Sequence, residues 1–169
     1  MSRFLNYNLH NNDFPWLKGK EILINKIPVR ALRVNYVGEL GWELHHPINQ
    51  MESLYDAIYE VGKKEKIINF GTYAVNSLRM EKAYRGWGSE LTGEISLVEA
   101  GMDRFFNLKK KNNFIGAKVL QEKIQSGVDI KILYLEVDVG NVDARGNEPV
   151  YHNDKVVGVV TSGGYGFRS

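Results

Sequence analysis

The sequence predicts an α+β protein in which a mixed segment of strands and helices precedes a short all-β tail. Three observations support this prediction. Residue types alternate as in strands before residue 46, helical periodicity follows between residues 49 and 125, and composition becomes β-branched and turn-rich after Gly127. We therefore place a domain boundary near residue 127, with a first domain over 1–127 and the start of a second over 128–169.

The first strands are expected to form a hairpin followed by a returning strand. Residues 21–25 and 28–37 alternate in character around a turn at 25–27, and residues 42–45 return after a glycine-bounded turn. On the returning strand, Trp42 and Glu43 must face opposite sides. Because a lone carboxylate is costly to bury, we expect Glu43 to lie away from the core.

Three helices are expected in the first domain. The first begins near Asn49, where Glu52 would complete a capping box, and it carries an apolar stripe that we expect to be core. The second spans residues 72–82, and the third spans residues 114–125. The stripe consists of Met51, Leu54, Tyr55, Ile58 and Tyr59. A long irregular stretch from Ser89 to Gly101 is typical of functional loops.

The tail is expected to contain strands at 131–137 and 155–161, separated by a turn-rich segment at 143–147. Three or four strands cannot close a barrel and would leave their edges exposed. We therefore expect the chain to be part of a longer architecture.

Composition narrows the classes of function. The chain has 169 residues, 43% of them apolar and 25% charged, and its net charge of +2 suggests neither nucleic acid nor an anionic membrane as a partner. No apolar run is long enough for a membrane span, and cysteine is absent. A cytoplasmic location is the simplest expectation. The four histidines lack ligand spacing, so we expect no metal site.

Two groups of residues could carry chemistry. A glutamate at position 39 or 43 could accept two hydrogen bonds from an amino-pyrimidinone edge, although Glu39 by residue type alone is a solvated turn residue. Tyr84, Arg85 and Trp87 follow the second helix, where they could stack on a planar ligand and hold a carboxylate. They could equally cover the domain surface, and the residues alone leave both interpretations open. Ser162 has no evident base nearby.

Several motifs resemble, in order, those of the glycine cleavage system T-protein family. They are Tyr36-Val37-Gly38-Glu39-Leu40-Gly41-Trp42-Glu43, Asn76-Ser77-Leu78-Arg79-Met80-Glu81-Lys82, Leu97-Val98-Glu99-Ala100-Gly101, Asn113-Phe114-Ile115-Gly116 and Val156-Val157-Gly158-Val159-Val160-Thr161-Ser162-Gly163. Residues 42–44 and 81–88 are more similar to the folate modules of dimethylglycine and sarcosine dehydrogenases. Dimethylsulfoniopropionate demethylases share this module and remain a possible subgroup.

The resemblance implies a ferredoxin-like folate-binding module followed by an incomplete C-terminal β-barrel. It implies one-carbon transfer to tetrahydrofolate from an N-methyl amine, an iminium or an aminomethyl donor. Glu43 would grip the pterin ring, while Tyr36 and Tyr84 would line the pocket with Arg85 and Trp87 nearby. The family has an arginine where this chain has Val75, and Arg79 or Arg85 could replace it as the cation for the folate tail.

The resemblance leaves the catalytic residue unknown. The acidic residue that the family uses near the reacting folate nitrogen belongs upstream of the aligned region, so enzymatic activity of the chain stays an open question. FAD would take part only through a separate or missing flavin domain. The alternatives are a non-catalytic folate-binding or regulatory module, and a structural subunit that needs a flavin or N-terminal partner.

Overall fold

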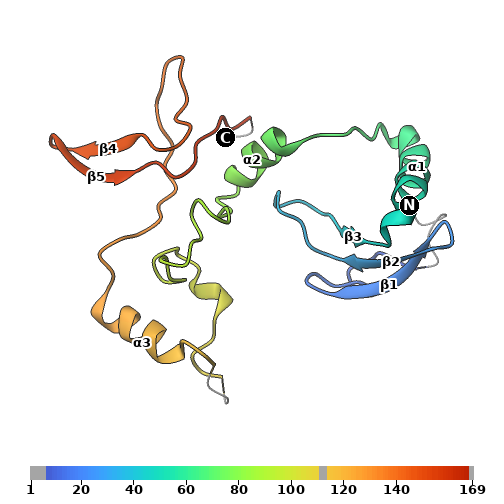
Figure 1. Ribbon diagram of the computed structural model, residues 1–169, viewed down its shortest axis with the longest axis horizontal. Helices are drawn as coiled ribbons and strands as arrows, with labels where there is room; N and C mark the ends of the chain where they lie inside the picture. Colours follow the sequence, from blue (N-terminus) through green and yellow to red (C-terminus); the bar gives the residue numbers. More distant parts are fainter. Residues whose placement is uncertain (1–6, 111–113, 168–169) are drawn as a thin grey trace. The chain divides into compact units, whose positions relative to one another are not determined.

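The computed structural model is a mixed α/β structure that describes residues 7–110 and 114–167 (Figure 1). It divides into two compact units, a first unit over Met1–Val75 and a second unit over Asn76–Ser169. Each unit has its own sheet, and the division falls within a helix, α2 (Thr72–Met80).

The first unit is built on an antiparallel sheet with strand order β1-β2-β3. Strands β1 (Gly19–Ile24) and β2 (Ile27–Leu32) form the predicted hairpin, and β3 (Glu43–His45) is the predicted returning strand. The hairpin turns on Asn25 and Lys26, whose φ angles of 48° and 66° are those of a two-residue turn that matches strand twist.

Strand β2 ends at Leu32, so the prediction of a strand to residue 37 was wrong over its last residues. The Asn35 side chain explains the difference. Its Oδ1 accepts hydrogen bonds from the amides of Val37 and Glu39 at 3.0 and 3.1 Å. A side chain that captures local amides in this way favours a turn over a ladder.

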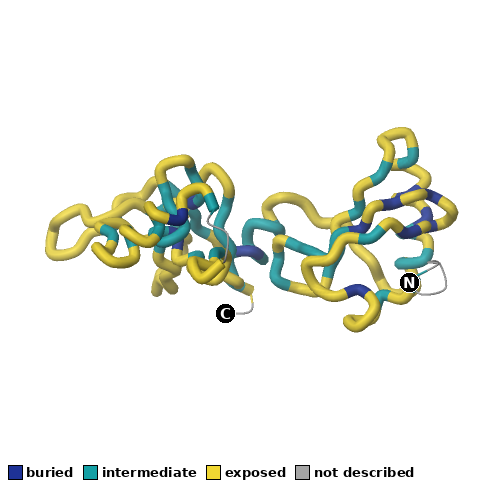
Figure 2. The backbone as a smooth tube through the Cα atoms, turned by 90° about the horizontal axis from the view of Figure 1, so that it is seen from below, coloured by how far each residue is buried: buried dark blue, intermediate teal, exposed yellow. Residues whose placement is uncertain are grey.

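An apolar core lies on one face of this sheet, against helix α1 (Met51–Gly62). Many of the buried positions of the first unit lie on the hairpin, and others lie elsewhere along the chain (Figure 2). The core residues are Phe14, Ile22, Ile24, Ile27, Val29, Ala31 and Leu54. Only part of the predicted helical stripe is core, because Leu54 is buried and Ile58 packs on it while Met51 and Tyr55 stay exposed.

The expected capping box is not formed. Helix α1 is capped by Gln50 without a side-chain hydrogen bond, because a 3-10 turn over Ile48–Gln50 continues directly into the helix. Asn49 therefore lies inside that turn instead of preceding the helix, and its side chain is not at the capping position.

The second unit contains the remainder of α2, helix α3 (Ala117–Ser126) and a 3-10 turn over Asp103–Phe105. Both predicted helices are present, although Asn113 of the expected third-helix start lies outside the described residues. Helix α2 ends in a Schellman arrangement. Ala83 takes a left-handed φ of 54°, Tyr84 N donates to Arg79 O at 2.9 Å, and Ala83 N donates to Met80 O at 2.8 Å.

The tail contains one hairpin, formed by β4 (Pro149–His152) and β5 (Lys155–Val159). Asn153 and Asp154 form its turn with left-handed φ angles of 49° and 59°. Within residues 7–110 and 114–167, no closed barrel is formed and the strand predicted at 131–137 joins no sheet. Instead, the Ile132 amide bonds the Glu99 carbonyl at 2.8 Å, which attaches this segment to the irregular loop.

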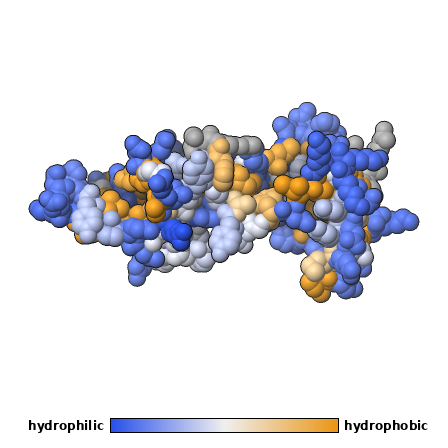
Figure 3. Space-filling model, turned by 90° about the horizontal axis from the view of Figure 1, so that it is seen from above, coloured by the Kyte–Doolittle hydropathy of each residue, from blue (hydrophilic) through white to orange (hydrophobic). Residues whose placement is uncertain are grey.

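Many large apolar side chains remain exposed in the tail, including Val156 and Val157 of β5. Apolar groups are visible on the molecular surface in Figure 3. Among the described residues, every helix is too short or too polar to cross a lipid bilayer.

Candidate functional site

The turn between β2 and β3 is organised around Asn35. Its Nδ2 donates to the Glu39 carbonyl, in addition to the two amide bonds that its Oδ1 accepts. Gly38 takes a φ of 73°, which a side chain would strain. A Cβ on Gly41 would lie 3.1 Å from the Asn35 Cβ, so this second glycine allows the chain to close over Asn35. Glycine is therefore needed at the two positions for different reasons: backbone conformation at Gly38 and close packing at Gly41.

After the turn, Glu43 lies on the face of the sheet that points away from the apolar core. Glu43 pairs with Leu32 in register, its side chain is 55% exposed, and its carboxylate lies 3.5 Å from His45 Nε2. The preceding residue faces the other way: the Trp42 ring lies 6.2 Å from the Phe14 ring and 5.7 Å from the Arg33 guanidinium. The predicted separation of Trp42 and Glu43 on opposite faces is confirmed.

Two further details concern this region. Trp42 Nε1 is buried and has no hydrogen-bond partner within the described part of the chain. Tyr36, the first residue of the motif, is partly exposed in the turn itself. Tyr36 and Glu43 thus belong to one strand-turn-strand element of the first unit.

The other three candidate residues lie in the second unit, on the loop that follows α2. The Arg85 guanidinium donates to the carbonyls of Ala100 and Ala83 at 3.2 and 3.1 Å. Tyr84 is partly buried, and Trp87 is 87% exposed. The loop therefore presents an aromatic ring to solvent while the arginine is engaged with backbone carbonyls.

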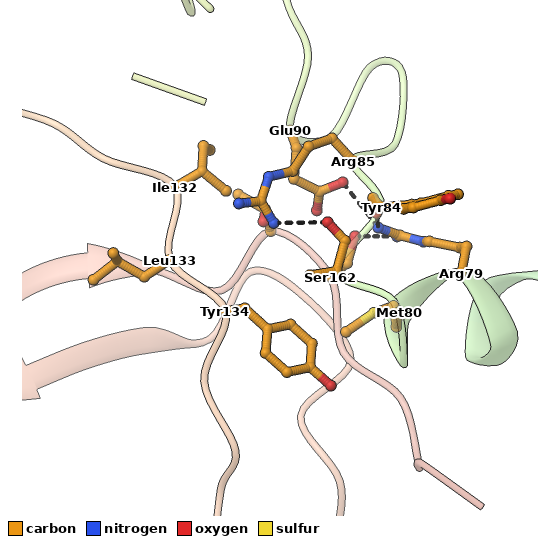
Figure 4. A pocket seen from close by; sticks show the side chains of 11 residues that line it. Arg79, Met80, Tyr84, Arg85, Glu90, Ile132, Leu133, Tyr134 and Ser162 are labelled. Atoms are coloured by element: carbon orange, nitrogen blue, oxygen red, sulfur yellow. Dashed lines mark hydrogen bonds and ion pairs between the residues drawn. The ribbon is translucent and has the colours of Figure 1, made fainter. Parts of the chain in front are cut away.

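A buried charged cluster lies beneath this loop. Arg79 and Glu90 form an ion pair of 3.1 Å, with side chains only 7% and 5% exposed. Arg79 also donates to Asn76 Oδ1, to the Tyr84 carbonyl and to Ser162 Oγ, at 2.9, 2.8 and 2.8 Å. Figure 4 shows the guanidinium directed at Glu90 and Ser162. Arg79 is thus committed to the interior, which argues against its expected use as a cation for a folate tail.

Glu90 stays charged within this cluster. Burial alone would raise the pKa of its carboxyl, but hydrogen bonds from Ser162, the Gly86 amide, Thr161 and Ser89 outweigh that effect and lower the pKa to about 2. The Gly86 amide donates to Glu90 Oε2 at 2.6 Å. A Cβ on Gly86 would lie 2.9 Å from that oxygen, so glycine allows the approach.

A small pocket adjoins the cluster (Figure 4). Its volume is about 40 Å³, and its lining includes Arg79, Tyr84, Arg85, Ile132 and Tyr134. Sites for drug-sized ligands measure roughly 300–1,000 Å³. This pocket can hold a few water molecules and is too small for a pterin ring.

A second charged pair stabilises the irregular loop. Lys123 of α3 donates to Glu99 Oε1 at 2.7 Å, and the Ser96 amide donates to Glu99 Oε2 at 2.7 Å. The Lys123 bond is the largest cause that lowers the Glu99 pKa to about 2. The Leu97–Gly101 motif is therefore a structural tie between the loop and α3.

Arg79, Glu90 and Ser162 are the residues whose joint role was not predicted from the sequence. Glu90 lies in the irregular stretch, and Ser162 is 83 positions from Arg79, so local pattern cannot pair them. The only local signal was a charged residue within the partly buried part of α2, which calls for a partner. No cluster of metal-ligating side chains occurs in the portion that the structure describes.

Comparison with known proteins places these features in a family. Residues 1–110 match the GCVT N-terminal domain, and residues 131–169 match the glycine cleavage T-protein C-terminal barrel domain. The chain belongs to the glycine cleavage T-protein family. This membership confirms the resemblance that the motifs indicated.

Three relatives illustrate the breadth of this T-protein family. The chain is 41% identical over 167 residues to human dimethylglycine dehydrogenase, which covers 99% of the chain and 19% of the relative. It is 34% identical over 143 residues to an aminomethyltransferase of Alkaliphilus oremlandii, covering 85% of the chain and 38% of the relative. It is 32% identical over 159 residues to the mouse pyruvate dehydrogenase phosphatase regulatory subunit, covering 91% and 18%.

Proposed function

We propose that this chain is a tetrahydrofolate-binding module for one-carbon transfer. The acceptor is tetrahydrofolate, and the donor is an N-methyl amine, an iminium or an aminomethyl compound. Membership of the T-protein family supports the proposal, as do relatives named as an aminomethyltransferase and a dimethylglycine dehydrogenase.

The observation that carries the proposal is the position of Glu43. Its carboxylate is exposed on the open face of a strand whose other face is anchored by Trp42 in the core. A pterin presents an exocyclic amine beside a ring N–H, and one carboxylate can accept both hydrogen bonds. A carboxylate on a strand paired within a sheet fits this task better than one on a loop.

The proposed roles of the remaining candidate residues combine the family resemblance with the chemistry of their side chains. Tyr36 and Tyr84 would pack on the folate rings or hydrogen-bond them, and the exposed ring of Trp87 offers a stacking surface. Arg85 would interact with the carboxylates of the folate tail. Catalysis in such a module consists mainly of holding the two reactants in position.

The chain spans 19% of the length of the human dehydrogenase that it matches. The wider architecture is therefore part of the proposal: a ferredoxin-like arrangement in the folate module over residues 1–127, and a barrel that begins after residue 127. FAD belongs to the proposal only through a separate flavin domain or partner subunit. A cytoplasmic location stays a prediction, and the human relative is named as mitochondrial.

A calorimetric titration with 5-formyltetrahydrofolate tests the role of Glu43. We expect Glu43→Gln to weaken binding roughly 10- to 100-fold, since a hydrogen bond to a charged group contributes about 1.5–3 kcal/mol. Glu39→Gln is the matched control, because Glu39 lies in the same exposed segment, and its affinity should stay at the wild-type value. Equal affinity of wild type and Glu43→Gln would remove Glu43 from the site.

The second candidate function is regulatory, without chemistry. The observation that favours it is the similarity to a relative named as the regulatory subunit of a phosphatase. In that case the chain would bind reduced folate but would not accelerate methylene-tetrahydrofolate formation from formaldehyde or an iminium donor. A structural subunit would instead co-elute with a flavin-containing partner.

A further inference from the structure

The Arg79–Glu90 ion pair contacts the backbone of the Tyr84–Gly88 loop at two points, in addition to the loop's own backbone hydrogen bonds. Arg79 Nη1 donates to the Tyr84 carbonyl at 2.8 Å, and Glu90 Oε2 accepts from the Gly86 amide at 2.6 Å. The cation thus holds a carbonyl and the anion holds an amide, on either side of Arg85. Together, these two hydrogen bonds fix the orientation of the two peptide units on either side of Arg85.

These contacts depend on the burial of the ion pair and on the close approach of Gly86 to Glu90. Both partners of the ion pair are almost completely buried, so water competes little for their hydrogen bonds. A Cβ on Gly86 would lie 2.7 Å from Ser89 Oγ as well as 2.9 Å from the Glu90 carboxylate. A larger residue at position 86 would therefore push the loop away from its anchor.

The C-terminal segment supplies a third anchor. Ser162 Oγ accepts from Arg79 Nη2 at 2.8 Å and hydrogen-bonds Glu90, so it joins both charges of the pair. Two further bonds attach the same segment to α2: Ser77 Oγ donates to the Tyr165 carbonyl at 2.6 Å, and the Phe167 amide donates to Glu81 Oε1 at 2.8 Å. The loop, the helix and residues 162–167 therefore share one hydrogen-bonded network.

We propose that Arg79, Glu90 and Ser162 are positioning residues that hold the Tyr84–Gly88 loop in its ligand-binding arrangement and link it to the C-terminal segment. The inference rests on the proposed function, in which this loop contributes Tyr84, Arg85 and Trp87. The three residues do not touch the ligand. They act by keeping the loop backbone in one arrangement, so that little ordering remains to be done when the ligand binds.

Two measurements on the full chain test this proposal. Amide hydrogen exchange by NMR reports directly on Gly86 and Tyr84, and calorimetry with 5-formyltetrahydrofolate reports on affinity. Ser162→Ala removes one hydroxyl and leaves the ion pair in place, and Glu90→Gln removes the charge at constant shape. We expect both to raise Gly86 exchange about tenfold or more and to weaken binding about tenfold, with exchange in β1 and β2 unchanged.

Two control variants make the test specific. Glu94→Gln alters an exposed glutamate in the same irregular stretch and should change neither readout. Ser162→Thr keeps the hydroxyl and should restore both the slow exchange and the affinity that Ser162→Ala loses.

The outcomes separate this inference from the proposed function. A wild-type chain that gives no heat with the folate would defeat the proposed function, and Gly86 exchange would still decide whether the cluster holds the loop. Unchanged Gly86 exchange in Ser162→Ala and Glu90→Gln would overturn the positioning role. Faster exchange with wild-type affinity would also overturn it, because the loop would then not need its anchor for binding.

Discussion

The two compact units differ in the side chains that they bury: those of the first are apolar, and those of the second include an ion pair. The first unit is built around apolar side chains, with Phe14, Ile22, Ile24 and Val29 almost completely buried. In the second unit the buried residues that the structure describes are Ala100 and Ala117 together with the charged Arg79 and Glu90. The first unit is therefore held by burial of apolar area, which is non-directional, and the second by hydrogen bonds between specific atoms.

Their hairpins make the contrast sharper. The turns at Asn25-Lys26 and Asn153-Asp154 have nearly the same left-handed geometry. The first hairpin nevertheless covers a core, while β5 of the second is exposed along its length. Local turn chemistry forms a hairpin in both cases, and only the first finds a surface to cover within the described chain.

The largest expected effect is in the charged interior. Arg79→Met should destabilise the second unit by roughly 3–5 kcal/mol, because removal of one partner leaves a buried charge without compensation. Glu90 would then lose its ion pair while its side chain is only 5% exposed. Urea unfolding monitored by segment-resolved hydrogen exchange would measure the loss. A change below about 1 kcal/mol would mean that the pair is solvated in solution.

A matched pair of valines tests the apolar interior. Val29→Ala should cost the first unit about 2–3 kcal/mol from lost burial and a residual cavity, since Val29 is 2% exposed. Val156→Ala in β5 should change stability by less than about 0.5 kcal/mol, because that side chain is 61% exposed. Both are read from denaturant unfolding. Equal losses would show that the second hairpin is covered in solution.

A smaller gain is expected at the end of α2. Ala83 adopts a left-handed φ of 54° at a Schellman position where glycine is usual. Ala83→Gly should stabilise the second unit by up to about 1 kcal/mol, since the relief of strain exceeds the entropy cost of glycine. Thermal unfolding measures the gain, and Ala74→Gly within the same helix should destabilise instead.

Acid should act selectively on the second unit. The pKa values of Glu90 and Glu99 are about 2 in the folded chain against 4.5 for the free group. Because each carboxyl has a lower pKa in the folded state than in the unfolded state, its ionised form stabilises the folded state above pH 4.5. This stabilisation is lost as the pH falls from about 4.5 towards 2. Hydrogen exchange in the second unit should accelerate over this window, and Glu99→Gln should flatten the response. Equal acceleration in the first unit would contradict the assignment.

The sequence was a good guide to the helices of both units, and in the tail it indicated β5 but not β4. Residues 72–82 and 114–125 gave helices close to α2 and α3, and the glycine turn before Glu43 was located correctly. The family motifs were recognised in order and the family is confirmed. The expected roles of Tyr36, Glu43, Tyr84, Arg85 and Trp87 stay predictions that folate titration can test.

Predictions failed where a side chain competed with the local pattern. Residues 33–37 alternate as a strand should, but Asn35 takes up the amides that a ladder would need. The segment at 131–137 also alternates, and in the described structure it pairs with no strand. Periodicity reports which face a side chain would take in a sheet, but it cannot supply the neighbouring strand.

The sequence by itself determined the turn of the first hairpin, the glycine turn before Glu43, the helices and the family, because these depend on neighbouring residues or on motifs that keep their order. Only the tertiary structure decided that Trp42 packs on Phe14 and that Arg79 meets Glu90 and Ser162. The physical reason is the separation of the interacting residues along the sequence. Hydrogen bonds between residues 83 positions apart follow from the path of the folded backbone, which no local propensity encodes.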